Sequence, residues 1–418
     1  MSQNSIQSLL PISRGRALGF CLLLAAFELL TYIGSDMVMP AMLQVVADLN
    51  ADARHVPTAL NAYLLGGVAL QWLIGPLSDR YGRKPLLVAG AVGFALACLA
   101  AVGSRDIELF NLLRFIQGLS LGFVMVVSYP ALQEAFPEKD AVRLMALLAN
   151  IALLSPLIGP LLGSLLLGLL PWRGLFALIG ALAALVAVGL WRWMPETLGV
   201  ERRDGSRLAA SPLRLGRSAR QYAALLRNAP FMHGSVALGL LSIPLVGWIG
   251  LSPLLLMRGL GLSGIEYGLW QLPVFGGLIA GNLTLNRLAA RLELERVLRL
   301  ALWPLFGGLA ALLALTWSSG ALPALAAGLT LYAFGLGLGH ATLYRFTLYA
   351  SDSGKGAVAA MLGMISTALL GLGCSALAWL GAGAGLQAFA GWAALGAGLA
   401  AWPLWRLLKQ RAYALQAA

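Results

Sequence analysis

The sequence predicts an all-α integral membrane protein with twelve transmembrane helices. Of its residues, 59% are hydrophobic and only 11% are charged, whereas a soluble globular protein has about 25% charged residues. Twelve apolar stretches each provide the roughly 20 residues that cross about 30 Å of hydrocarbon as a helix. Their hydrophobic period is helical rather than alternating, which argues against an outer-membrane barrel.

The predicted spans divide into two groups of six. They cover residues 17–39, 56–77, 85–104, 107–131, 143–169, 172–194, 231–257, 265–288, 298–317, 321–345, 357–382 and 386–407. The longest interruption is polar and rich in arginine, and lies between the sixth and seventh spans. We therefore expect a six-helix bundle over residues 1–194, a cytoplasmic linker over 195–230 and a second six-helix bundle over 231–418.

The basic residues indicate the orientation of the chain. Most of the 29 Lys and Arg residues fall on the side that faces the cytoplasm if both termini are inside. Arg114 falls within a span, and the outward loops carry Arg54, Arg105, Arg173 and Arg258. Because short cytoplasmic loops retain basic residues, we expect both termini in the cytoplasm. The charges are spread over short segments, which favours contact with anionic membrane lipids and argues against nucleic acid.

Two carboxylic acids, Glu28 and Asp36, lie inside the first predicted span. A charge at bilayer depth costs at least about 2.5–3.5 kcal/mol, so such residues usually mark an ion or substrate pathway. A separation of eight residues gives about 80° of rotation and about 12 Å along a helix, which places both acids on one wall of a cavity. Because low dielectric favours a neutral carboxylic acid, each can hold a proton and release it when a cation arrives. The sequence does not rank one acid above the other.

Arg114 lies in the fourth predicted span, with Gln117 three residues further on. Its positive charge would let an acid stay ionised when neither a proton nor a cation is bound. The competing interpretation is an arginine that is satisfied by backbone carbonyls. Arg114, Glu28 and Asp36 are the candidates for proton coupling and cation binding, and the candidates for a substrate cavity are Tyr32, Ser35, Gln117, Asn150, Trp248 and Phe275.

A short cytoplasmic turn, Gly-Pro-Leu-Ser-Asp-Arg-Tyr-Gly-Arg-Lys-Pro, occupies residues 75–85. Its glycines permit special backbone angles, and its aspartate can cap a neighbouring helix end. Taken as composition alone, a short basic loop explains the turn equally well. The candidate gating residues are Gly75, Asp79, Arg80, Gly82 and Arg83.

This turn resembles the loop signature of the major facilitator superfamily. Arg114-Phe115-Ile116-Gln117-Gly118 resembles a motif of its proton-coupled members. The run from Ser155 to Ser164 resembles the motif of its exporters, with Gly159, Pro160 and Gly163 as the matching residues. The structural alternative for that run is a kinked and tightly packed helix.

Within the superfamily, the chain is most similar to the bacterial twelve-span drug:proton antiporters of the MdfA type. The run Glu28-Leu29-Leu30-Thr31-Tyr32-Ile33-Gly34-Ser35-Asp36 matches that type except at Ser35, where asparagine is usual. Asn150-Ile151-Ala152 and Arg345-Phe346-Thr347-Leu348 extend the match, with Arg345 at the cytoplasmic end of its span.

The resemblance implies the major facilitator fold, two six-helix bundles around a central cavity, in a bacterial inner membrane. It implies efflux of lipophilic cationic and neutral drugs in exchange for protons, by a monomer that alternates access and uses no cofactor. The alternative within the superfamily is a transporter specific for one metabolite or for one antibiotic such as chloramphenicol.

An enzyme is disfavoured, because the spans hold no catalytic constellation. The scattered cysteines and histidines indicate no metal site. ATP-driven transport is disfavoured as well, because the sequence holds no glycine-rich phosphate loop with Lys and Ser or Thr.

Overall fold

A computed structural model describes residues 8–210, 215–315, 322–351, 355–381 and 385–416. Within them the chain is helical apart from turns, loops and one isolated bridge between Glu201 and Arg207. The chain divides into two compact units. Unit 1 comprises Met1–Val38, Ala62–Gly159 and Leu166–Gly216, and unit 2 comprises Met39–Asn61, Pro160–Leu165 and Arg217–Ala418.

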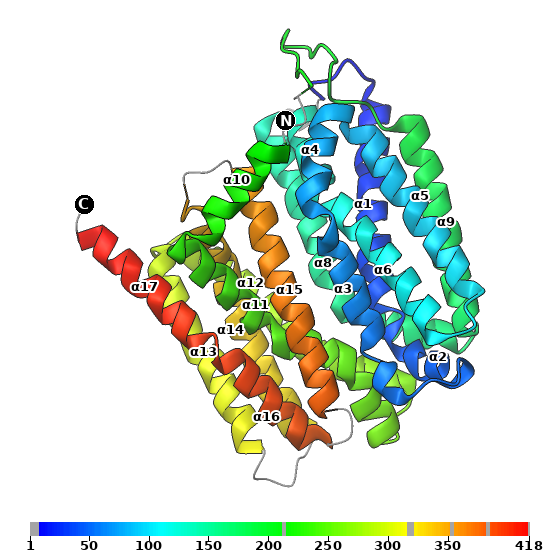
Figure 1. Cartoon of the computed structure of the whole chain (residues 1–418), viewed down its shortest axis with the longest axis vertical. Coiled ribbons are helices and arrows are strands. Elements are labelled where there is room, and N and C mark those ends of the chain that lie inside the picture. The colour runs from blue at the N-terminus through cyan, green and yellow to red at the C-terminus, as the bar shows by residue number, and fades with distance from the viewer. Residues whose placement is uncertain (1–7, 211–214, 316–321, 352–354, 382–384, 417–418) are drawn as a thin grey trace, which may run out of the picture. The chain divides into compact units, whose positions relative to one another are not determined.

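Unit 1 is a bundle of long helices. Its elements are α1 (Arg14–Asp36), α4 (Gln71–Tyr81), α5 (Arg83–Val102), α6 (Ile107–Phe123), the π-helical η3 (Val124–Ser128), α7 (Tyr129–Ala135) and α9 (Trp172–Trp193), with most of α3 (Thr58–Ala69) and α8 (Glu138–Leu167). Helix α9 packs on both α5 and α1, and α5 also packs on α6 (Figure 1). Side chains cap the starts of α1 and α6, since Ser13 accepts from Arg16 N and Asp106 from Leu109 N.

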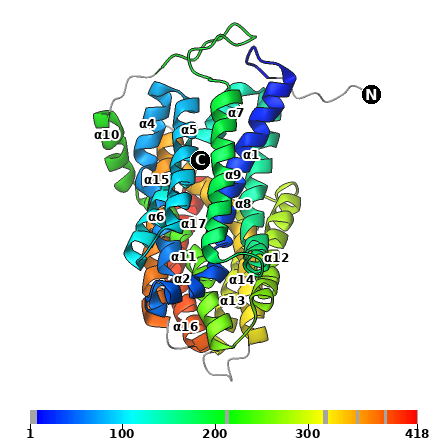
Figure 2. The same ribbon diagram turned by 90° about the vertical axis from the view of Figure 1, so that its right-hand side faces the viewer.

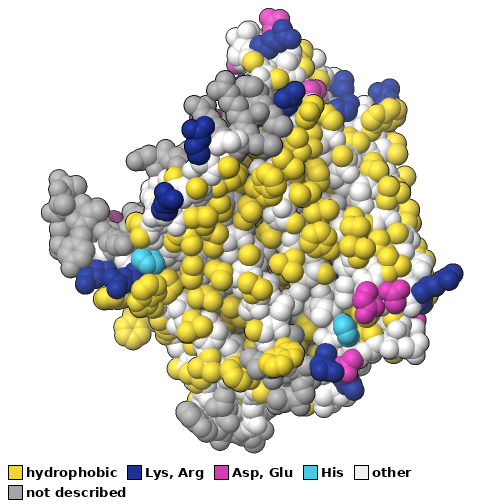
Figure 3. Space-filling view, viewed as in Figure 1, with side chains coloured by type: hydrophobic (Ala, Val, Ile, Leu, Met, Phe, Trp, Pro, Cys, Tyr) yellow, Lys and Arg dark blue, Asp and Glu magenta, His cyan; other side chains and the backbone are white. Residues whose placement is uncertain are grey.

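The outer faces of the long helices are apolar. Leu22, Leu96 and Leu185 lie on α1, α5 and α9 and are largely exposed. Figure 3 shows hydrophobic side chains over much of the face drawn, with acidic and basic side chains mainly toward its margins. Exposed leucines on helices of this length indicate contact with hydrocarbon rather than water.

Helices α3 and α6 approach each other backbone to backbone. A Cβ atom added to Gly118 would lie 1.9 Å from the Tyr63 carbonyl oxygen, and one added to Gly66 would lie 2.0 Å from that of Phe115. Only glycine allows such an approach. This contact brings the Tyr63 ring next to Arg114.

Unit 2 contains the remaining elements. They are η1 (Met39–Ala41), α2 (Met42–Asp48), η2 (Ala53–His55), most of α10 (Leu215–Leu226), α11 (Ala229–Ser252), the π-helical η4 (Pro253–Gly259), α12 (Gly264–Ala289), α13 (Leu294–Leu315), α14 (Leu322–Leu348), α15 (Lys355–Gly381), α16 (Gly385–Gly398) and α17 (Ala401–Gln416). Helix α14 packs on α12 and α13 (Figure 2). A Cβ on Gly281 would lie 2.1 Å from Phe334 O, and one on Gly337 would lie 2.2 Å from Leu278 O. Helices α12 and α14 thus repeat the glycine contact of α3 and α6.

The predicted membrane fold class is confirmed. Among the described residues, nine helical segments are long and apolar enough to cross a membrane, or ten if α3 and α4 form one bent span. Each of the twelve predicted spans coincides with a helix or a run of helices, although the predicted ends at residues 316–317, 321 and 382 lie outside the described part. The last predicted span corresponds to two shorter helices, α16 and α17.

The second predicted span is not one straight helix. Helices α3 and α4 meet at a bend of 44°. At the bend, two side chains form hydrogen bonds to main-chain carbonyls. Gln71 Nε2 donates to Gly67 O at 3.0 Å, and Trp72 Nε1 donates to Ala69 O at 3.1 Å. Side chains inserted into the hydrogen-bond ladder are a known cause of helix kinks. The predicted linker also contains a helix, α10, which the polar composition did not indicate.

Candidate functional site

Glu28 is buried on α1, with 1% of its surface exposed. Its Oε1 accepts a hydrogen bond from the Tyr129 hydroxyl at 3.3 Å. Its Oε2 is buried and has no hydrogen-bond partner among the described residues. The carboxyl group therefore keeps capacity for a proton, a water molecule or a ligand.

Asp36 lies two turns further along α1 and is 6% exposed. Its Oδ2 accepts from the Ser155 hydroxyl of α8 at 2.7 Å. A Cβ on Gly159 would lie 2.8 Å from the Asp36 Cβ. Glycine at position 159 therefore lets α8 pack directly against the acid.

Arg114 is fully buried on α6. Its Nη1 donates to Gln117 Oε1 at 2.8 Å and to Gly34 O at 3.3 Å, and its guanidinium carbon lies 4.7 Å from the centre of the Tyr63 ring. Nε and Nη2 have no partner among the described residues, and no ion pair joins Arg114 to an acid within them. Satisfaction by backbone carbonyls, the competing interpretation of Arg114, thus accounts for only part of the surroundings of its guanidinium.

The other cavity candidates of unit 1 differ in burial. Gln117 is buried and its amide donates to Ala97 O at 3.2 Å. Tyr32 is half-buried on α1 within electrostatic reach of both acids. Ser35 is buried and Asn150 is exposed on α8.

The candidates of unit 2 lie on three helices. Trp248 of α11 is buried, with its ring centre 5.7 Å from that of Phe389. Phe275 is buried on α12. Arg345, near the end of α14, is exposed, and its guanidinium lies 5.1 Å from the Tyr349 ring.

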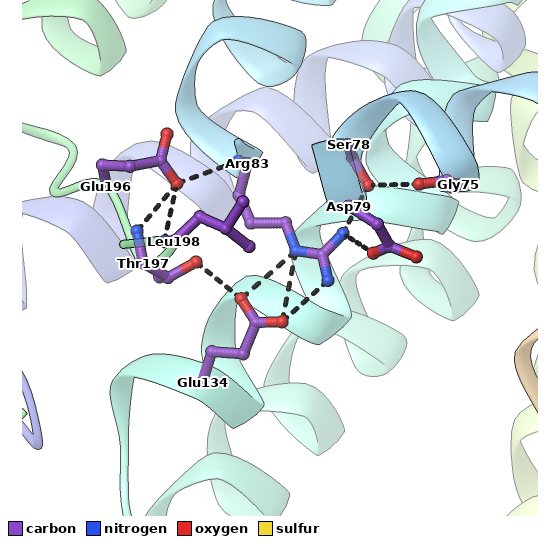
Figure 4. Close-up of polar contacts among 8 residues, drawn as sticks. All are labelled: Gly75, Ser78, Asp79, Arg83, Glu134, Glu196, Thr197 and Leu198. Carbon is purple, nitrogen blue, oxygen red and sulfur yellow. Dashed lines mark hydrogen bonds and ion pairs between the residues drawn. The ribbon is translucent and has the colours of Figure 1, made fainter. Parts of the chain in front are cut away.

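The turn after α4 forms a charged cluster around Arg83 (Figure 4). The Arg83 guanidinium pairs with Glu134 Oε1 of α7 at 2.7 Å and with Asp79 Oδ1 at 2.6 Å. It also donates to the Ser78 hydroxyl, which donates in turn to Gly75 O at 2.9 Å. Arg83 therefore ties the end of α4 to the neighbouring helix α7.

The start of the linker completes the cluster. Glu196 accepts from Arg83 N at 3.0 Å and from Lys84 N at 3.2 Å, and so caps the N-terminus of α5. Thr197 donates its hydroxyl hydrogen to Glu134 Oε2. The prediction that Asp79 caps a neighbouring helix end is therefore wrong, because Glu196 fills that position and Asp79 pairs with Arg83.

Gly82 separates α4 from α5 with a φ of +107°, a backbone conformation that favours glycine. A Cβ there would also collide with the Glu196 carboxylate. Arg80 is exposed, 5.4 Å from the Tyr81 ring, and is not part of the cluster. The structure therefore supports a tight turn held by the ion pairs and hydrogen bonds of Arg83, rather than a short loop that is merely basic.

Several residues at these sites were not identified from the sequence. Tyr63 and Tyr129 contact Arg114 and Glu28, and Glu134 contacts Arg83. A tyrosine near the end of a predicted span resembles an ordinary interface residue. The available signal was their polarity within or next to predicted spans.

A sequence model of the Major Facilitator Superfamily matches residues 24–378 of the chain. The chain belongs to the major facilitator superfamily. It is 47% identical over 386 residues to a "Multidrug transporter MdfA" of Edwardsiella ictaluri (strain 93-146), covering 92% of each protein. It is 46% identical over 387 residues to one of Escherichia coli O6:H1, also covering 92% of each. These relatives confirm the resemblance found in the sequence.

A solved transporter structure has the same fold. The crystal structure of a D-xylose-proton symporter aligns with a TM-score of 0.73 and 13% identity, covering 93% of this chain and 97% of the symporter. The family, its curated transporter relatives and the apolar helices show that the chain is a multi-pass membrane transporter rather than an enzyme.

Proposed function

We propose that the chain is a proton-coupled multidrug antiporter that exports lipophilic cationic and neutral compounds by alternating access. One observation carries this proposal: Glu28 and Asp36 are both buried on one membrane helix, with Arg114 buried on the helix beside it. The relatives named multidrug transporters support the substrate class.

Competition between a proton and a cation follows from buried carboxyl groups. A lipophilic cation stabilises an ionised acid, while a proton removes the charge that attracts the cation. The two ligands therefore bind at each other's expense. Arg114 donates to Gly34 O, two residues before Asp36 on α1, and its positive charge would stabilise the ionised acid when both ligands are absent.

The remaining candidates take supporting roles in this proposal. Gly75, Asp79, Arg80, Gly82 and Arg83 belong to a cytoplasmic gate, and Gly159, Pro160 and Gly163 keep α8 close to its neighbours. Cavity candidates in unit 1 are Tyr32, Ser35, Gln117 and Asn150, and those in unit 2 are Trp248, Phe275 and, at the cytoplasmic end, Arg345.

We further propose a monomer in a bacterial inner membrane with both termini in the cytoplasm. Its two six-helix bundles would be residues 1–194 and 231–418, joined by the linker 195–230. The Arg-rich linker would lie against anionic lipid headgroups.

The charge of the drug determines which part of the proton gradient drives export. One proton exchanged for one monovalent cation moves no net charge, whereas exchange for a neutral drug moves one charge, worth about 2.3 kcal/mol per 100 mV. In proteoliposomes we expect an imposed membrane potential to accelerate chloramphenicol transport several-fold and to leave tetraphenylphosphonium transport nearly unchanged. An imposed pH gradient should drive both.

Tracer flux under separately clamped potential and pH gradient measures this difference. Equal acceleration of both compounds by the potential would contradict one-for-one exchange. If neither compound moves while a single metabolite does, the protein is a specific transporter instead.

A further inference from the structure

The hydroxyl of Ser155 bonds differently from those of four other serines in the described helices. Ser164, Ser242, Ser366 and Ser375 each donate to the main-chain carbonyl one turn back, at 2.8–2.9 Å. This is the usual bond of a serine inside a helix. The Ser155 hydroxyl instead donates across to Asp36 Oδ2 on α1 at 2.7 Å.

This bond is buried between α8 and α1. Ser155 is 2% exposed, and the contact of Gly159 with Asp36 holds α8 against α1 one turn further on. The titratable or charged groups that face Asp36 from the neighbouring elements are Arg114 on α6, Tyr63 on α3 and Tyr32 on α1. No ion pair joins Arg114 to Asp36 within the described residues, so Ser155 supplies the direct hydrogen bond to the carboxyl group.

We propose that Ser155 is a positioning residue for Asp36, whose hydroxyl stabilises the ionised carboxylate and thereby sets the pH at which a cation replaces the proton. This inference rests on the proposed function. A hydrogen bond to an ionised acceptor is about twice as strong as one to a neutral acceptor. When Asp36 takes up a proton, the advantage disappears and the hydroxyl can turn to the carbonyl of Ile151, the usual position one turn back.

Cation binding as a function of pH tests this role. Purified protein in lipid nanodiscs is titrated with radiolabelled tetraphenylphosphonium between pH 5 and 9, as the unsubstituted chain and as Ser155→Ala. We expect the midpoint of the pH profile to move about one unit toward alkaline pH, because a hydrogen bond to an ionised group changes a protonation equilibrium by about tenfold or more. Affinity at pH 9, where Asp36 is ionised in both proteins, should change by less than about twofold.

The matched control is Ser242→Ala, which removes a helix serine bonded one turn back to Leu238 O. Its midpoint should match that of the unsubstituted chain. If Ser155→Ala leaves the midpoint unchanged, the proposal is refuted and Ser155 is a packing residue. This holds even if the variant binds the cation more weakly at every pH. If the unsubstituted chain shows no pH-dependent cation binding, the proposed function is rejected and this role with it.

A second measurement needs no ligand. The melting temperature of Ser155→Ala, relative to the unsubstituted chain, should fall as pH rises through the titration of Asp36, since the variant lacks a bond to the ionised form. In an Asp36→Asn background, Ser155→Ala should cause a difference that does not vary with pH. A pH-dependent difference that persists in that background would overturn the assignment.

Discussion

Replacing Arg114 by methionine is expected to lower drug-driven proton release at least about tenfold. The substitution keeps an unbranched but shorter side chain and leaves Gln117 Oε1 and Gly34 O without their donor. It also removes the positive charge that acts on Asp36, so the acid should hold its proton more tightly and give it up less readily to a cation. The rate of pH change in membrane vesicles after drug addition measures the loss.

Arg173 offers a matched control. Like Arg114, it contacts both a main-chain carbonyl and an aromatic ring. Its Nε donates to Val102 O at 3.1 Å, and its guanidinium lies 4.2 Å from the Trp172 ring. Arg173 lies in the first turn of α9, far in sequence from the acids. We expect Arg173→Met to transport normally, and Arg114→Lys to recover only part of the activity because lysine lacks the planar fork. Normal transport by a folded Arg114→Met protein would contradict the role given to this residue.

The second large effect is expected at Arg83. Its side chain is 9% exposed and that of Glu134 is 16% exposed, so Arg83→Gln leaves a mostly buried carboxylate without its cation. Breaking a buried ion pair from one side costs about 3–5 kcal/mol. We expect the free energy of unfolding to fall by about 3 kcal/mol, at the low end of that range because both groups retain some contact with solvent.

Two further variants separate this effect from a general loss of charge. Adding Glu134→Gln to Arg83→Gln should recover part of the stability, because the uncompensated charge is gone. The pair Arg299–Glu295 on α13 has an ion-pair distance of 2.6 Å, but its arginine is 61% exposed. Arg299→Gln should therefore cost at most about 1 kcal/mol. Denaturant titration in detergent compares the variants. Equal losses of unfolding free energy in the Arg83 and Arg299 variants would argue against a buried ion pair at Arg83.

The sequence predicted those features that depend on one helix. Apolar length determines a span, and the two acids of α1 stand out because charge is rare at that depth. The contact between Arg114 and Gln117 was also accessible, because residues three apart lie on one helix face. The structure places these two side chains within 2.8 Å.

Contacts between separate helices could not be predicted from the sequence in the same way. Tyr63 contacts Arg114 because glycines let α3 and α6 touch, and sequence spacing does not show which glycines face each other. Glu196 caps α5 from a position 113 residues further along the chain than Arg83. The bend between α3 and α4 coincides with side-chain bonds to carbonyls, which sequence spacing does not reveal.

The most direct test of proton-coupled drug export uses inverted membrane vesicles that hold a preformed proton gradient. A lipophilic cation or a neutral antibiotic is added to vesicles with the unsubstituted protein or with the Glu28→Gln, Asp36→Asn double variant, and the internal pH is followed. We expect drugs to dissipate the gradient only when both acids are present. An equal response from a folded double variant would contradict coupling through these acids.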